Sequence, residues 1–113
     1  MTNPTTQLDD AIHQRVRLGI MLILQEVDKI EFTVLRDELE TTDGNVNSHL
    51  IALAAAELVK IEKAASGRRK TWIASTKKGR QALTRELELL DAIVQRGSRS
   101  TAVRRVDPRP LPA

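Results

Sequence analysis

The sequence contains no cysteine and only two aromatic residues, Phe32 and Trp72. A chain without cysteine forms no disulfide and offers no thiolate to a metal ion, and this composition fits a cytoplasmic protein. Proteins that bind single-stranded nucleic acids usually stack several exposed aromatic side chains on the bases. Two aromatic residues therefore argue against that class of binder.

The chain also lacks a long apolar segment, because it contains no run of about 18 apolar residues, and we expect no transmembrane helix. Its first ten residues, MTNPTTQLDD, do not show the basic-then-apolar order of a secretory signal peptide. A length of 113 residues is enough for one domain with a modest core.

The residue patterns of enzymes are missing as well. The sequence shows no nucleophile–base pair, no glycine-rich phosphate loop and no carboxylate–histidine cluster. His13 and His49 are too far apart in the chain to suggest a pair of metal ligands. We therefore expect neither enzyme activity nor a metal or cofactor.

The positive charge is concentrated in one internal segment and in the tail. The net charge is only +3, yet residues 57–85 carry nine lysines and arginines against two acidic residues. Residues 1–56 carry four against nine, and residues 96–113 carry five against one. A basic segment of this kind is either a solvated surface or a patch that faces phosphate, and composition alone favours neither.

Apolar residues that recur three and four positions apart predict four helices. Their expected bounds are Asp9 to Gln25 or Glu26, Thr33 to Leu39, Asp43 to Glu57, and Lys77 to about Gln95. Thr33, Thr42 and Thr76 stand where helices begin, and threonine is a good N-cap residue. In the second helix Val34, Leu35 and Leu39 are expected to face the core.

Short alternations of apolar and polar residues predict the strands. Ile30 and Phe32 flank Glu31 in one brief strand, and the segments 58–63 and 70–75 form a hairpin with a turn at Ser66-Gly67. Residues 1–7 are expected to be a flexible leader, and the arginine- and proline-rich residues 96–113 a disordered tail. The folded domain between them would span residues 8–95.

The third predicted helix opens with the segment TTDGNVNSH, residues 41–49, which is rich in poor helix formers. On a helix, Val46, Leu50 and Leu53 face the core, whereas the outward residues are small or hydrogen-bonding: Gly44, Asn45, Ser48 and Ala52. Ordinary helix capping accounts for part of this composition. It also suits a helix that enters the major groove of DNA, where asparagine binds the edge of adenine bidentately.

Three consecutive cations follow in the hairpin. In the segment SGRRK, residues 66–70, they lie at or just after the turn, where they would reach phosphates or the minor groove. A charged hairpin tip often serves only solubility. After a helix with a small polar outer face, however, a basic hairpin indicates a helix-turn-helix with a wing at residues 64–70.

In four segments the sequence resembles the small winged helix-turn-helix transcriptional regulators related to the MarR and ArsR groups. The segments are IHQRVRLGIML, FTVLRDELETTDGNVNSHLIAL, GRRKTW and TKKGRQAL, within residues 8–95. The resemblance implies a mainly α fold with a small β-hairpin, in the order helix, short strand, helix, helix, two strands, helix. It also implies a homodimeric, sequence-specific binder of double-stranded DNA, usually a repressor, with residues 42–57 as the recognition helix.

The resemblance assigns residues to two surfaces. The DNA contacts map onto Thr42, Asp43, Asn45, Asn47, Ser48, His49, Arg68, Arg69 and Lys70. The dimer contacts map onto Ile12, Val16, Leu83, Leu87, Leu90 and Val94, of which the last four also recur at heptad-type spacing. Among the DNA contacts, Asn45 and Ser48 are expected to read bases, and Arg68 and Arg69 to bind the backbone or the minor groove.

Three positions depart from the family pattern. Ile51 replaces a common basic residue, Glu57 a glycine that often ends the recognition helix, and Ser75 a core leucine. The missing charge at Ile51 and the acidic first half leave open an alternative, a winged-helix module that binds protein instead of DNA. Trp72 would anchor such a partner if it faces outward, but the alternation does not tell whether Trp72 or Ile73 does so. No small-molecule effector is indicated.

Overall fold

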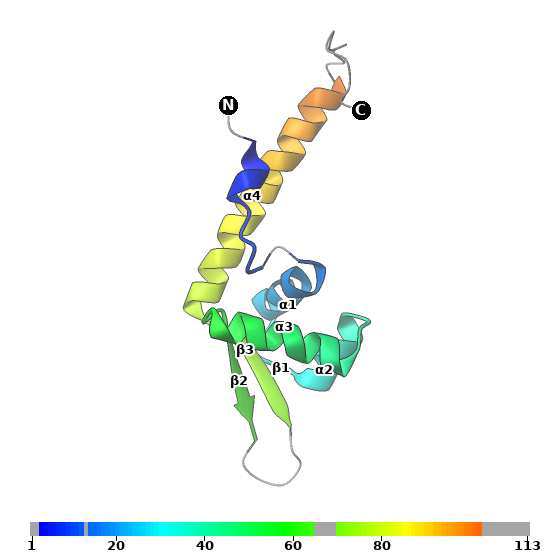
Figure 1. The fold of residues 1–113 in the computed structure, drawn as a ribbon, viewed down its shortest axis with the longest axis vertical. Helices are drawn as coiled ribbons and strands as arrows, with labels where there is room; N and C mark the ends of the chain where they lie inside the picture. Colours follow the sequence, from blue (N-terminus) through cyan, green and yellow to red (C-terminus); the bar gives the residue numbers. More distant parts are fainter. Residues whose placement is uncertain (1–2, 13, 65–69, 103–113) are drawn as a thin grey trace.

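The computed structural model describes residues 3–12, 14–64 and 70–102. In chain order its elements are η1 (Pro4–Gln7, a 3-10 turn), α1 (Arg15–Glu26), β1 (Ile30–Glu31), α2 (Phe32–Glu38), α3 (Asp43–Ala55), β2 (Val59–Lys63), β3 (Thr71–Ser75) and α4 (Lys77–Ala102). In Figure 1, α3 crosses the lower half of the molecule, the two strands of the hairpin extend downward from it, and α4 rises away from them. This order of elements confirms the predicted fold class.

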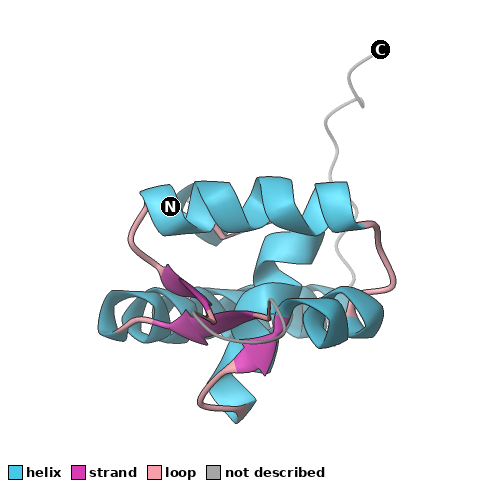
Figure 2. Ribbon diagram, turned by 90° about the horizontal axis from the view of Figure 1, so that it is seen from below, coloured by secondary structure: helices cyan, strands magenta, loops and turns pink. Residues whose placement is uncertain are grey.

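The three strands form one antiparallel sheet in the order β1-β3-β2, so β1 adds a third strand to the predicted hairpin. Ile30 and Glu31 of β1 pair with Ile73 and Trp72 of β3. Figure 2 shows the strands near the middle of the view, with helices around them. Ile73 is fully buried, whereas Trp72 is half-buried on the opposite face of the sheet, with Lys29 Nζ 4.8 Å from the centre of its ring. Trp72 is therefore the outward residue of the pair.

The hydrophobic core joins α1, α2, α3, the sheet and the first turns of α4. Its buried large side chains include Val16, Ile20 and Leu24 of α1 and the predicted inward residues of the third helix, Val46, Leu50 and Leu53. The prediction for the second helix is confirmed for Leu35 and Leu39 but wrong for Val34, which is 46% exposed. α2 begins at Phe32 with Glu31 as its N-cap and without a capping side chain, so Thr33 is not the cap.

α1 begins at Arg15, not at Asp9 as predicted. The side chain of Gln14 caps it, because its Oε1 accepts hydrogen bonds from the backbone N–H groups of Val16 and Arg17, at 2.9 and 3.1 Å. Residues 9–12 instead form a turn that buries Ile12 completely against the core. The apolar spacing of the sequence continues through this turn, and the prediction of a helix there was wrong for that reason.

Within the predicted leader, residues 4–7 form η1 beside α4 (Figure 1). The buried carboxylate of Glu86 on α4 fastens the segment after η1, since its Oε1 accepts a hydrogen bond from the backbone N–H of Asp9 at 3.0 Å. At the other end α4 continues to Ala102 and so includes residues 96–102 of the predicted tail. Residues 1–2 of the predicted leader and residues 103–113 of the predicted tail lie outside the described residues.

Both α2 and α3 are followed, two residues after their last helical residue, by a glutamate in the left-handed region, Glu40 with φ 50° and Glu57 with φ 63°. At the end of α3 the N–H of Glu57 donates to the carbonyl of Ala54, and the N–H of Leu58 donates to that of Leu53, each at 2.9 Å. These two bonds are the Schellman motif, which glycine usually completes. α3 therefore ends at Ala55, two residues before the predicted end, although a side chain at positive φ costs about 1–2 kcal/mol.

Glu57→Gly is expected to make the fold about 1 kcal/mol more stable than Glu57→Ala, because glycine has no Cβ to oppose the positive φ. Alanine is the matched control, since both variants lose the exposed 3.6 Å ion pair between Glu57 and Lys78. The free energy of unfolding of the two variants in urea measures the difference. Equal stabilities would contradict the assignment of backbone strain to this position.

Candidate nucleic-acid interface

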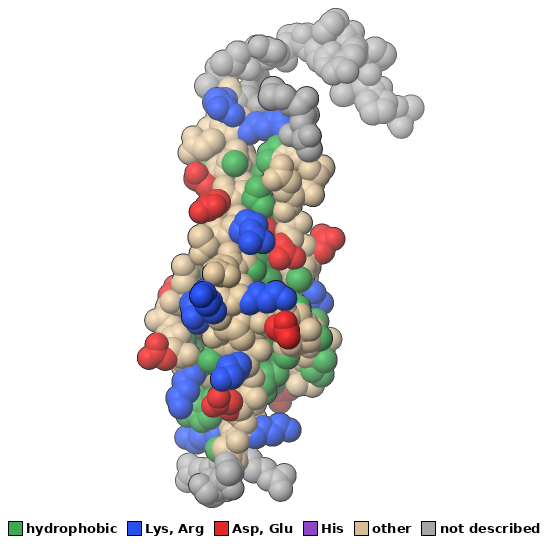
Figure 3. All heavy atoms as spheres, turned by 90° about the vertical axis from the view of Figure 1, so that its left-hand side faces the viewer, with side chains coloured by type: hydrophobic (Ala, Val, Ile, Leu, Met, Phe, Trp, Pro, Cys, Tyr) green, Lys and Arg blue, Asp and Glu red, His purple; other side chains and the backbone are tan. Residues whose placement is uncertain are grey.

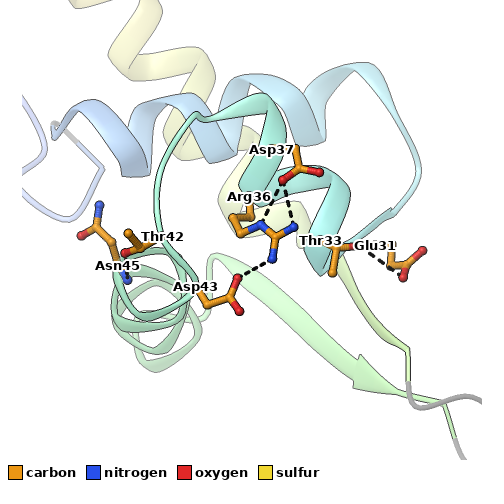
Figure 4. Close-up of polar contacts among 7 residues, drawn as sticks. All are labelled: Glu31, Thr33, Arg36, Asp37, Thr42, Asp43 and Asn45. Atoms are coloured by element: carbon orange, nitrogen blue, oxygen red, sulfur yellow. Dashed lines mark hydrogen bonds and ion pairs between the residues drawn. The ribbon is translucent and has the colours of Figure 1, made fainter.

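The turn between α2 and α3 is held by side chains of both helices. The hydroxyl of Thr42 accepts a hydrogen bond from the backbone N–H of Asn45 at 3.2 Å, which confirms Thr42 as the N-cap of α3. Arg36 of α2 donates to the carboxylate of Asp43 at 2.7 Å and to that of Asp37 at 3.0 Å (Figure 4). The bond to Asp43, followed by that to Asp37, raises the pKa of Arg36. Asp43 thus joins the first turn of α3 to α2.

One continuous face of α3 is exposed to solvent. It consists of residues three and four apart, and we call it the α3 outer face: Gly44, Asn47, Ser48, Ile51 and Ala55. The opposite face is buried to 99% or more at Val46, Leu50 and Leu53. Among the residues that the structure describes, the side chains of Asn47 and Ser48 make no intramolecular hydrogen bond, so their donors and acceptors are available to a ligand.

Asn45, one of the two residues expected from the sequence to read bases, lies at the border of this face. It is half-buried, and its Nδ2 donates to the hydroxyl of Thr41 at 2.8 Å. Its amide is therefore held against the turn between α2 and α3. Ser48 is exposed as predicted, and Asn47, predicted on the flank of the helix, is exposed as well.

His49 is turned toward α1. Its Nδ1 accepts a hydrogen bond from Nε of Arg17 at 3.1 Å, and the same guanidinium donates to the carbonyl of Ala11 at 3.3 Å. Burial, and then the positive charge of Arg17, lower the pKa of His49 below its usual 6.5. The imidazole is therefore neutral at pH 7, and the nitrogen that remains for a ligand is Nε2 as a donor. Arg17 carried no signal in the sequence, because its contact with His49 joins residues of two separate helices.

The predicted wing is described at its base only. Lys70 is exposed, and its carbonyl accepts a hydrogen bond from the N–H of Ala64 at 2.8 Å, which closes the described end of the hairpin. Lys63 is also exposed at this base. The predicted contacts Arg68 and Arg69 lie outside the described residues.

The six residues predicted for dimer contact fall into two groups. Ile12, Val16 and Leu83 are each at most 1% exposed, so their side chains belong to the core of the single chain. Leu87 and Leu90 are half-buried, and Val94 is 61% exposed on the part of α4 beyond the core. Hydrophobic side chains are visible along the upper part of the molecule, where α4 runs (Figure 3). The described part of the chain contains no group of three or more metal-ligating side chains.

Comparison with known families matches residues 16–94 to the winged helix DNA-binding domain. The chain belongs to this family. An uncharacterized protein of Methanocaldococcus jannaschii is 40% identical over 68 residues, which are 59% of this chain and 74% of that protein. The structure of a transcriptional regulator homologue from Pyrococcus horikoshii superimposes with a TM-score of 0.72 and 33% identity, over 75% of this chain and 85% of that chain.

A MarR-family transcriptional regulator from Silicibacter pomeroyi shares the fold, with a TM-score of 0.61 and 19% identity over 84% of this chain and 60% of that one. The chain is thus a winged helix-turn-helix transcriptional regulator that binds DNA, and members of this family are not enzymes. In this regulator α2 and α3 form the helix-turn-helix, and β2 with β3 forms the wing. No helix in the described residues is long and apolar enough to cross a membrane.

Proposed function

We propose that this winged helix regulator binds double-stranded DNA sequence-specifically, with α3 in the major groove, and represses transcription as a homodimer. The observation that carries the proposal is the α3 outer face, where Asn47 and Ser48 are exposed and free of intramolecular hydrogen bonds. A major groove about 12 Å wide admits a helix, and amide and hydroxyl groups there bind base edges. The small residues Gly44 and Ala55 on the same face let the helix backbone come close to the bases.

The backbone contacts come from the elements on either side of the α3 outer face. The N-terminus of α3 at Thr42 favours a phosphate, and Arg36 offsets the negative charge of Asp43 there. Lys70 stands at the base of the wing, and we retain Arg68 and Arg69 as the phosphate or minor-groove contacts that the sequence predicts. The hydrogen bonds of Asn45 and His49 within the chain support roles in placing α3 for these two residues.

The homodimer is proposed to form through the uncovered apolar side chains of α4. Leu87, Leu90 and Val94 recur at spacings of three and four, and two copies of such a seam bury each other. A dimer places two copies of α3 on half-sites about 34–36 Å apart, which predicts a near-palindromic site. Bound over a promoter in the cytoplasm, such a dimer would block the polymerase.

The alternative, a module that binds protein in place of DNA, is not favoured. Its expected anchor, Trp72, is half-buried, and Lys29 lies over its ring. The outward position of Trp72 therefore does not present an open aromatic surface.

A salt titration tests the proposal. The affinity of the full chain is measured for DNA from upstream of its own gene and for random DNA of equal length, over a range of salt concentrations. Saturable binding that prefers the upstream DNA at every salt concentration is expected, with log affinity falling linearly against log salt. Equal binding to both DNAs that vanishes with salt would overturn sequence-specific recognition.

A further inference from the structure

Ile51 is 58% exposed at the middle of the α3 outer face, one helical turn after Asn47 and Ser48. Its neighbours on this face are Asn47 and Ser48 one turn before it and Ala55 one turn after it, so the isoleucine is the only large apolar side chain of the α3 outer face. Within the described residues it is the most exposed of the large hydrophobic side chains on the helix-turn-helix. No neighbouring element in the part of the chain that the structure describes covers it.

The major groove offers one kind of apolar group to such a side chain. Each base edge there carries hydrogen-bond donors or acceptors, and thymine adds its C5-methyl group. An isoleucine side chain forms no hydrogen bond and repels no phosphate, so its favourable contact in the groove is with this methyl. The desolvation of two apolar groups then favours thymine over cytosine, which has a hydrogen atom at that place.

We infer that Ile51 determines part of the operator sequence by packing against the methyl group of a thymine. The inference rests on the proposed function, since it requires α3 to lie in the major groove. One turn of helix advances about 5.4 Å, and base pairs lie about 3.4 Å apart along the groove. The thymine is therefore expected one or two base pairs from those that Asn47 and Ser48 contact.

Uracil substitution in the operator tests the inference, because deoxyuridine removes only the methyl group and keeps the base pairing. The operator is first located by footprinting on the upstream DNA. Each thymine is then replaced singly, and the affinities of the wild-type chain and of Ile51→Ala are measured. For the wild-type chain, the replacement of one particular thymine in each half-site is expected to lower the affinity for the operator about fourfold, which corresponds to the burial of one methyl group.

Ile51→Ala is expected to bind the unmodified operator more weakly and to show no further loss when that thymine is replaced. Ile51→Val keeps part of the contact and should retain part of the sensitivity to uracil. Val34→Ala is the matched control, since Val34 is a similarly exposed apolar residue on α2 and is expected to leave the pattern unchanged.

The possible outcomes separate this inference from the function on which it rests. Selective binding of the upstream DNA, with the same uracil losses in wild type and Ile51→Ala, would overturn the role of Ile51 and leave the regulator intact. If the wild-type chain binds the upstream DNA and random DNA equally, the proposed function has failed, and the inference fails with it. An equal effect of Val34→Ala would show that exposed apolar side chains act on binding without contact to the base.

Discussion

Gly79→Ala is expected to destabilise the fold by about 3 kcal/mol or more. Gly79 lies in the first turn of α4, where an added Cβ would overlap the carbonyl oxygen of Leu58 and lie 2.9 Å from Cε of Met21. The same carbonyl accepts the N–H of Thr76 at 3.1 Å, and the Thr76 hydroxyl donates to the carbonyl of Glu57 at 2.7 Å. Because this contact is made by backbone, it relaxes only if α4 moves away from the end of the helix-turn-helix.

Gly97→Ala is the control for this prediction. Gly97 lies in the same helix, and a Cβ built there meets nothing within 4 Å. This substitution is expected to leave stability unchanged or to raise it by up to about 1 kcal/mol through helix propensity. Urea denaturation of both variants measures the difference. If Gly79→Ala unfolds at the same urea concentration as Gly97→Ala, the close approach of α4 to Leu58 is not present in solution.

Asn47→Ala is expected to lose about 1–3 kcal/mol of binding free energy on the specific DNA site and much less on random DNA. The reason is that Asn47 is exposed on the α3 outer face without an internal partner, so its amide can pair with a base edge. Affinity measurements with the upstream and the random DNA, at one salt concentration, give both losses. An equal loss on the two DNAs would contradict a base contact.

Asn45→Ala and Lys70→Ala serve as controls for that experiment. The Asn45 amide is bonded to Thr41, so this variant is expected to cost less on the specific site than Asn47→Ala, contrary to the prediction made from the sequence. Lys70→Ala should weaken binding to both DNAs alike and reduce the slope of log affinity against log salt concentration by about 1. A larger specific loss for Asn45→Ala than for Asn47→Ala would return the base-reading role to Asn45.

Local periodicity and capping determined most of the fold. The inward side of α3 at Val46, Leu50 and Leu53 follows from the helical period, which depends only on residues a few positions apart. The caps at Thr42 and Thr76 also depend only on residues close in the chain, because each threonine hydroxyl accepts a hydrogen bond from the backbone N–H three residues later. For the same reason the small and polar composition of the outward face of α3 could be predicted before the tertiary structure was known.

The ends of the helices were less well determined by the sequence. The apolar spacing begins before α1, in the turn that buries Ile12. The chain leaves α3 through Glu57, which has a conformation typical of glycine. α4 continues to Ala102, past Gly97, where the sequence suggested disorder. Spacing and composition describe which faces are apolar, whereas the position of an end depends on hydrogen bonds of the individual turn.

The tertiary structure alone decided which polar side chains of α3 remain available to DNA. Asn45 is bonded to Thr41, His49 to Arg17 and Asp43 to Arg36, whereas Asn47 and Ser48 have no such partner among the described residues. Two of these three bonds join α3 to another helix, and the pattern of residues along one helix contains no information on contacts between helices. Thus the sequence by itself determined a winged helix with a polar recognition surface, and the packing of α1 and α2 against α3 determined the part of that surface that is free to read bases.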